Sequence, residues 1–262
     1  MAERLGLETT LRAARARGRK LLVPYVTGGM DDTWAESLRA MAAAGADAIE
    51  VGIPFSDPVM DGPTIQETSK RALDRGTTPA SIFAELREID AGVPLVAMTY
   101  YNLVFHPGEA RFARWLVESG VSGAIVPDVP LEEAGPWCAA ADAEGLETVM
   151  LAAPTASDER LARVCERARG FVYGVSLLGV TGERTSLSAS ATQIAKRLKA
   201  TTDKPVVVGI GISTPEQAMA VCEAGADGVV VASAIMRRLL DGEGPEAAGD
   251  SVARFREALD RG

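Results

Sequence analysis

Residues 205–233 read PVVVGIGISTPEQAMAVCEAGADGVVVAS, and this stretch points to the fold class. Two short valine runs, typical of buried strands, flank a segment with the spacing of a helix. Thr214 before Pro215 is typical of a helix start, and Gly225 is typical of a helix end. A strand, a helix and a second strand in this order predict a right-handed βαβ unit with parallel strands.

The same alternation of apolar runs and helical segments extends along the whole chain. The runs begin about 22 to 34 residues apart, except for one interval of about 48 residues after the second run. The predicted strands begin near Leu21, Asp47, Leu95, Gly123, Glu147, Phe171, Pro205 and Asp227.

Eight repeats over 262 residues predict an α/β protein with a closed (β/α)8 TIM barrel, rather than an open doubly wound sheet. No GxGxxG follows the first strand, which disfavours a dinucleotide-binding fold. We expect residues 1–262 to form a single domain, with extended βα loops after strands two and six. The segment Leu5–Arg17 is predicted to be an extra N-terminal helix that covers the bottom of the barrel.

Composition narrows the class of protein. The chain has 27 Lys and Arg against 36 Asp and Glu, so its net charge of −9 argues against nucleic-acid binding. The N-terminus lacks the apolar core of a signal peptide, and no stretch resembles a membrane span, so a cytoplasmic protein is expected. The single histidine, His106, argues against a zinc site, and no metal is expected. Three separated cysteines predict reduced thiols: Cys138, Cys165 and Cys222.

Two acids lie around one loop near the second predicted strand. Glu50 lies within the strand pattern Ala48–Ile53, and Asp61 follows a loop that contains two prolines. Burying a carboxylate without partners is costly, and two carboxylates in one cleft can divide acid and base roles. The alternative interpretation is an Asp-Pro turn beside a structural glutamate.

The loops after strands seven and eight predict a phosphate site. Barrels commonly bind phosphate there, and Gly209 and Gly211 allow backbone N–H groups to approach an anion. Ser233 begins a short helix whose N-terminal amides favour negative charge. Gly182, in the loop after strand six, is a third candidate. Alternatively, these glycines simply end the strands tightly.

These features indicate a reaction class but not one reaction. The sequence has no lysine placed for a Schiff base, no metal cluster and no cofactor fingerprint. An acid pair, Tyr173 and a phosphate site suggest proton transfer on a phosphorylated small molecule. An isomerase and a lyase both fit this description.

Several longer motifs resemble those of a known protein family. Residues 49–62, IEVGIPFSDPVMDG, resemble the signature of the tryptophan synthase alpha subunit family. Residues 24–29, 98–105, 127–130, 178–182 and 209–217 resemble its other blocks in the same order. The resemblance implies a lyase of tryptophan biosynthesis that cleaves indole-3-glycerol phosphate to indole and glyceraldehyde 3-phosphate by a retro-aldol reaction without a cofactor.

The resemblance also implies roles for individual residues. Glu50 would protonate C3 of the indole and take the proton of the glycerol hydroxyl, and Asp61 would bind the indole N–H. The implied substrate-binding residues are Tyr25, Met98, Tyr173, Thr181 and Ile210. The implied phosphate-binding residues are Gly182, Gly211, Ala232 and Ser233. Ala232 departs from the pattern, because the family often has glycine there.

A partner follows from the same resemblance. The family works as an α2β2 heterotetramer, in which pyridoxal phosphate belongs to the beta subunit that receives the indole. Met60 stands where the family usually has a small residue, and this difference affects the loop that would pack against the partner. The resemblance therefore defines the partner less closely than it defines the reaction. Two alternatives remain: a stand-alone lyase that releases indole for specialised metabolism, and a silent barrel that activates a partner. The implied partner-facing residues are Pro54, Asp57, Pro58 and Asn102.

Overall fold

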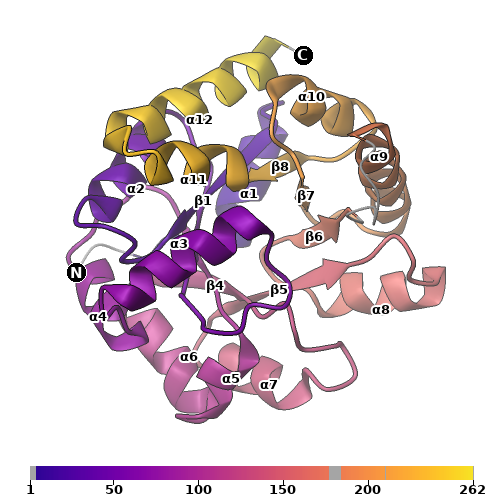
Figure 1. The fold of residues 1–262 in the computed structure, drawn as a ribbon. Helices are drawn as coiled ribbons and strands as arrows, with labels where there is room; N and C mark the ends of the chain where they lie inside the picture. The colour runs from indigo at the N-terminus through magenta and orange to yellow at the C-terminus, as the bar shows by residue number, and fades with distance from the viewer. Residues whose placement is uncertain (1–3, 177–183, 210, 262) are drawn as a thin grey trace.

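The computed structural model describes residues 4–176, 184–209 and 211–261, with the backbone alone over 184–189. Eight parallel strands form one closed barrel in chain order, and the last strand pairs with the first (Figure 1). This confirms the predicted (β/α)8 TIM barrel. The strands are β1 (Leu21–Thr27), β2 (Ile49–Gly52), β3 (Leu95–Met98), β4 (Val121–Ile125), β5 (Glu147–Ala152), β6 (Val172–Val175), β7 (Val206–Gly209) and β8 (Gly228–Val231).

Helices surround the barrel, and two of them lie within the long interval after β2. The extended loop expected there therefore ends at Pro63, where α3 begins; the loop expected after β6 lies outside the described residues. The helices are α1 (Leu7–Ala16), α2 (Trp34–Ala43), α3 (Pro63–Asp74), α4 (Pro79–Leu86), α5 (Tyr101–Phe105), α6 (Glu109–Glu118), α7 (Gly135–Ala143), α8 (Asp158–Arg167), α9 (Arg184–Thr201), α10 (Pro215–Glu223), α11 (Ser233–Leu240) and α12 (Gly244–Arg261).

The barrel has two apolar layers, because its strands are buried on both faces. Val207 of β7 belongs to the interior cluster, while Val206 and Val208 belong to the outer cluster between the strands and the helices. Within the described residues, no helix is both long and apolar enough to span a membrane.

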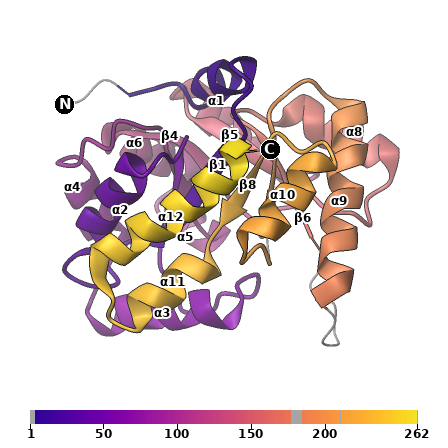
Figure 2. The same cartoon turned by 90° about the horizontal axis from the view of Figure 1, so that it is seen from above.

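Helix α1 closes one end of the barrel, as predicted for Leu5–Arg17. Leu7 and Leu11 are fully buried in the interior cluster. Figure 2 shows α1 at the end of the barrel opposite α3 and α11. The Glu147 carboxylate accepts the N–H groups of Leu7 at 2.6 Å and Glu8 at 2.9 Å. A side chain of β5 thus satisfies the first amides of α1, which has no cap of its own.

Two further acids connect the strand starts to the helices at this end. Asp47 accepts the Leu22 N–H at 2.9 Å, and it forms ion pairs with Arg19 at 2.6 Å and with Arg256 of α12 at 3.3 Å. Asp227 similarly accepts the backbone N–H of Val206, a bond of 2.8 Å. The polar partners offset the cost of burying these acids, so losing one partner would destabilise the arrangement of strands and helices.

Replacing Glu147 by alanine should lower the free energy of unfolding by about 1–2 kcal/mol, because two partly buried N–H groups at the start of α1 lose their acceptor. Urea unfolding followed by circular dichroism measures this loss. The matched control is Glu118→Ala, because Glu118 is exposed and forms only a 3.7 Å pair with Arg87. Equal stabilities of the two variants would contradict the capping role of Glu147.

Candidate active site

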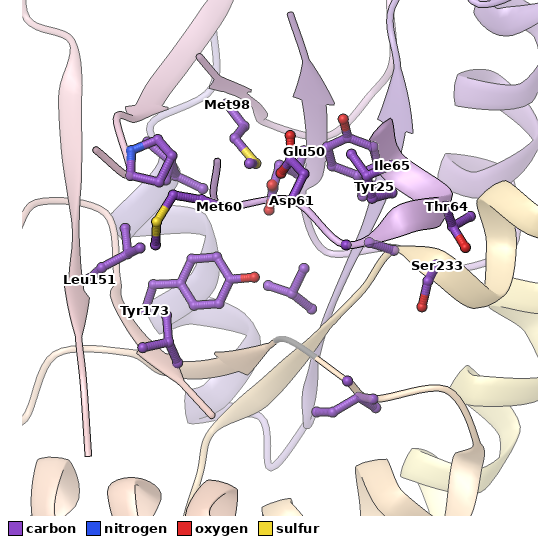
Figure 3. Close-up of a pocket in the computed structure, with 18 of the residues that line it drawn as sticks. Tyr25, Glu50, Met60, Asp61, Thr64, Ile65, Met98, Leu151, Tyr173 and Ser233 are labelled. Carbon is purple, nitrogen blue, oxygen red and sulfur yellow. The ribbon is translucent and has the colours of Figure 1, made fainter. Parts of the chain in front are cut away.

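A cavity of about 310 Å³ is lined by residues from the starts of α3 and α11, among others (Figure 3), and these helices lie at the end of the barrel opposite α1 (Figure 2). Ends of strands and the loops that follow them contribute its walls, which is where TIM barrels build active sites. Most of its lining is apolar, with two carboxylates among the exceptions. The lining residues are Tyr25, Glu50, Met60, Asp61, Gly62, Pro63, Thr64, Ile65, Met98, Ile125, Pro127, Leu151, Tyr173, Val175, Gly211, Ile212, Val230, Ala232 and Ser233.

Glu50 lies on β2 with its side chain inside the barrel, and only 2% of its surface is exposed. Its Oε2 atom has no hydrogen-bond partner among the described residues. Burial, with a smaller contribution from the nearby Asp61 charge, raises the pKa of Glu50 to about 8. The carboxyl group is therefore mostly protonated at neutral pH, and it can donate a proton.

Asp61 ends the loop that joins β2 to α3, directly before Gly62 and Pro63 at the helix start. Figure 3 shows Glu50 and Asp61 next to each other at the cavity wall. Burial raises the pKa of Asp61, and a hydrogen bond from Tyr100 partly offsets this effect. Because both acids face one cavity, ionisation of either makes ionisation of the other less favourable.

Two glycines create the space for two tyrosine rings. A Cβ atom on Gly52 would lie 1.8 Å from the hydroxyl of Tyr25, and one on Gly209 would lie 2.2 Å from the hydroxyl of Tyr173. Each tyrosine thus lies over a glycine of the following strand. Burial raises the pKa of both phenols, so both are neutral.

A hydroxyl chain holds the Tyr25 ring in place. Thr27 donates to the Tyr25 hydroxyl at 3.2 Å, and the hydroxyls of Thr27 and Thr68 are 2.7 Å apart. Thr68 also donates to the carbonyl of Ile65 at 2.9 Å. This chain runs from β1 to α3, the helix that follows Asp61.

The predicted phosphate end lies at the start of α11. Ser233 is the first residue of this helix and Ala232 is its N-cap, and both line the cavity. Gly211 lines it as well, with a φ of 85° that favours glycine. Helix amides and a glycine loop at this end can bind an anion. The arginine after the first turn, Arg237, is directed instead to Glu67 and Thr64.

Tyr100 was not predicted to be a site residue. Its hydroxyl accepts the N–H of Met60 at 3.0 Å, and its ring stacks on Phe55 with centroids 5.0 Å apart. It lies two residues after the end of β3, which is a position where barrels place functional side chains. This position at the end of a strand was the feature of the sequence from which Tyr100 could have been predicted to belong to the site.

The chain was compared with known proteins. A family model for the tryptophan synthase alpha chain matches residues 11–260. The tryptophan synthase alpha chain of Thermobifida fusca is 44% identical over 263 residues, covering 98% of this chain and 97% of that protein. The one from Gloeobacter violaceus is 44% identical over 247 residues, covering 93% and 89%.

Solved structures give the same result. Tryptophan synthase from Mycobacterium tuberculosis is 37% identical with a TM-score of 0.88, covering 98% of this chain and 99% of that chain. The alpha subunit from Legionella pneumophila is 32% identical with a TM-score of 0.86, covering 97% and 98%. The chain belongs to the tryptophan synthase alpha chain family.

The site residues expected from resemblance to this family fall into two groups. Thr181, Gly182 and Ile210 lie outside the described residues. The others line one cavity: Tyr25, Glu50, Asp61, Met98, Tyr173, Gly211, Ala232 and Ser233. Further apolar lining residues were not predicted, because no short pattern separates them from core positions: Ile65, Ile125, Pro127, Leu151, Val175, Ile212 and Val230.

The residues expected to face the family's beta subunit differ in exposure. Asp57 and Asn102 are exposed, Pro58 is partly exposed, and Pro54 is buried in this chain. Two large apolar side chains are exposed near them in sequence, Val59 at 80% and Phe105 at 64%. Met60 both lines the cavity and is 47% exposed, so it links the cavity to this surface.

Gly52→Ala should lower the free energy of unfolding by about 1–3 kcal/mol, because the added methyl group overlaps the Tyr25 phenol. The midpoint of urea unfolding measures this change. Gly135→Ala is the matched control, because a Cβ atom there meets nothing within 4 Å. A Gly52→Ala protein as stable as this control would contradict the close approach of ring and strand.

Proposed function

We propose that the chain cleaves indole-3-glycerol phosphate to indole and glyceraldehyde 3-phosphate, as the alpha subunit of tryptophan synthase. The observation that carries the proposal is the pairing, in one apolar cavity, of the buried Glu50 carboxyl with Asp61. Membership of the family supports the same reaction. We further propose that residues 1–262 form one domain and act in the cytoplasm, as expected for a biosynthetic enzyme of this family.

Substrate binding follows from the distribution of polar groups in the cavity. The indole ring fits among apolar side chains such as Met98 and Leu151, where its burial is favourable. The Asp61 carboxylate accepts the indole N–H, and the start of α11 at Ser233 binds the phosphate. The glycerol carbon next to the ring then lies between the two anchors, beside Glu50.

In the first step, the protonated Glu50 carboxyl donates its proton to C3 of the indole. C3 becomes tetrahedral, and the ring nitrogen acquires positive charge as an iminium. The Asp61 carboxylate stabilises that charge through the N–H it already binds. The cation attracts the electrons of the bond that is to break.

In the second step, the Glu50 carboxylate removes the proton of the hydroxyl on the carbon attached to C3. The O–H electrons form the aldehyde C=O, the bond from C3 to this carbon breaks, and its electron pair returns to the ring. Indole and glyceraldehyde 3-phosphate result, and Glu50 is protonated again. Every proton and electron pair is accounted for without a cofactor, and the described residues contain no cluster of potential metal ligands.

We propose that the beta subunit binds the surface that carries Val59 and Phe105. Both are exposed and lie close in sequence to the exposed Asp57 and Asn102, a mixture of apolar and polar side chains that is common in protein interfaces. Pyridoxal phosphate belongs to that partner. A stand-alone lyase that releases free indole is the second candidate, because the cavity contains both acids within one chain.

The pH dependence of indole formation tests the acid and base roles. kcat/KM should fall as pH rises above about 8, because Glu50 loses the proton that it must donate. It should also fall in acid, where Asp61 becomes protonated. Steady-state indole release measured across the pH range gives both limbs.

The matched variant is Glu50→Gln, which should lower kcat by about 10²- to 10⁴-fold and remove the alkaline limb from any residual rate. Glu118→Gln, an exposed glutamate, is the control and should leave the rate unchanged. Retention of most of the indole-forming rate by Glu50→Gln would sink the assignment.

Adding a beta subunit separates the alpha subunit from the stand-alone lyase. We expect turnover of the isolated chain to rise about tenfold or more with a saturating beta subunit, because a docked partner can close the site and complete the catalytic arrangement. Val59→Asp should abolish the stimulation and leave the basal rate unchanged. Full turnover without a partner would favour the stand-alone enzyme.

A further inference from the structure

Tyr100 occupies a buried position between the surface loop and the site. It lies two residues after β3 and is the N-cap of α5, and 3% of its surface is exposed. Its ring stacks on Phe55 with an interplanar angle of 21°, so the phenol has a fixed orientation. The hydroxyl accepts the backbone N–H of Met60 at 3.0 Å, directly before Asp61, and its interaction with the Asp61 carboxylate lowers the pKa of that acid.

The hydrogen bonds of this hydroxyl have a defined direction. The Met60 backbone N–H can only donate, so the phenol oxygen accepts it at 3.0 Å. The single phenol hydrogen then remains for the Asp61 carboxylate, which can only accept while ionised. One hydroxyl thus connects the backbone on one side of Asp61 to the carboxylate of Asp61 itself.

We propose that Tyr100 is the positioning residue for Asp61, holding its carboxylate in place to accept the indole N–H. This inference rests on the proposed function and deepens it. An ionised carboxylate has about four lone-pair sites, so it can accept from Tyr100 and from the indole together. Orienting the carboxylate in advance lowers the cost of binding the transition state.

The contacts of Tyr100 also connect Asp61 to the exposed surface. Val59 precedes the Met60 amide that Tyr100 binds, and α5, which ends at Phe105, begins at the next residue after Tyr100. A partner that contacts Val59 and Phe105 would therefore act on the two segments next to this hydroxyl, the loop before Met60 and helix α5. Val59 reaches Asp61 along the backbone through Met60, whereas Phe105 is connected to the same loop end through α5 and the Tyr100 hydroxyl.

Several titratable groups on other elements face this pair. Each interacts electrostatically with Asp61 or Tyr100, and all of them are still present in the variants described below. These groups are Glu50 on β2, Tyr25 on β1, Tyr173 on β6 and Asp128 after β4.

The decisive variant is Tyr100→Phe, which keeps the ring on Phe55 and removes the hydroxyl. kcat/KM for indole-3-glycerol phosphate should fall on the order of tenfold, because a charge-assisted hydrogen bond is lost. The acid limb of the pH profile should move to higher pH, because the interaction with Tyr100 that lowers the pKa of Asp61 is gone. Circular dichroism checks that the variant folds.

The neighbouring tyrosine supplies the matched control. Tyr101 donates its hydroxyl to Glu109 at 2.8 Å, away from the cavity lining. Tyr101→Phe should keep both the rate and the pH profile of the parent chain. A Tyr100→Phe profile that coincides with the Tyr101→Phe profile would overturn the proposal.

A double-mutant cycle shows whether Tyr100 acts through Asp61. Dissociation constants of a non-cleavable indole alkyl phosphate are measured for Tyr100→Phe, Asp61→Asn and the double variant. We expect Tyr100→Phe to weaken binding in the parent chain but to have no further effect on binding in the Asp61→Asn variant. Additive losses would reject the proposal. Failure of the proposed function is distinct, because the parent chain itself would then form no indole.

Discussion

Closure of the sheet is the constraint on which the rest of the molecule depends. Residues 21–24 of β1 pair with residues 228–231 of β8, and this pairing leaves the barrel without an open edge. Gly228 makes it possible, because a Cβ atom there would lie 2.2 Å from the carbonyl oxygen of Leu21. Only after closure do the carboxyl ends of the strands surround one cavity, and only then does Glu50 become buried.

The two ends of the barrel treat acidic side chains differently. At the α1 end, Asp47, Glu147 and Asp227 accept backbone N–H groups, and their charges contribute to stability. At the other end, Glu50 has an oxygen without a partner among the described residues, and burial favours its protonated form. Acidic side chains thus hold strands and helices together at one end of the barrel, whereas at the other end an acid is available for proton transfer.

Much of the fold could be predicted from the sequence, because valine-rich runs and glycine-ended helices are local signals. The starts of β2 and β4 differ by two residues from the prediction, since Ala48 and Gly123 carry little strand preference. Glu50 and Asp61 could be singled out because acids are unusual in such a strand and loop. Tyr100 could not, because its role depends on how a loop from β2 folds against the end of β3.

The ion pair between Asp47 and Arg256 has a consequence for synthesis of the chain. These residues are 209 positions apart, and Arg256 lies on α12, which is synthesised after all eight strands. Until β8 emerges, the growing polypeptide carries an incomplete sheet with exposed edges, and until α12 emerges Asp47 lacks one of its cationic partners. Completion of the native fold therefore has to wait for synthesis of β8 and α12, and stalled products that end before them are left open to aggregation and to quality-control proteases.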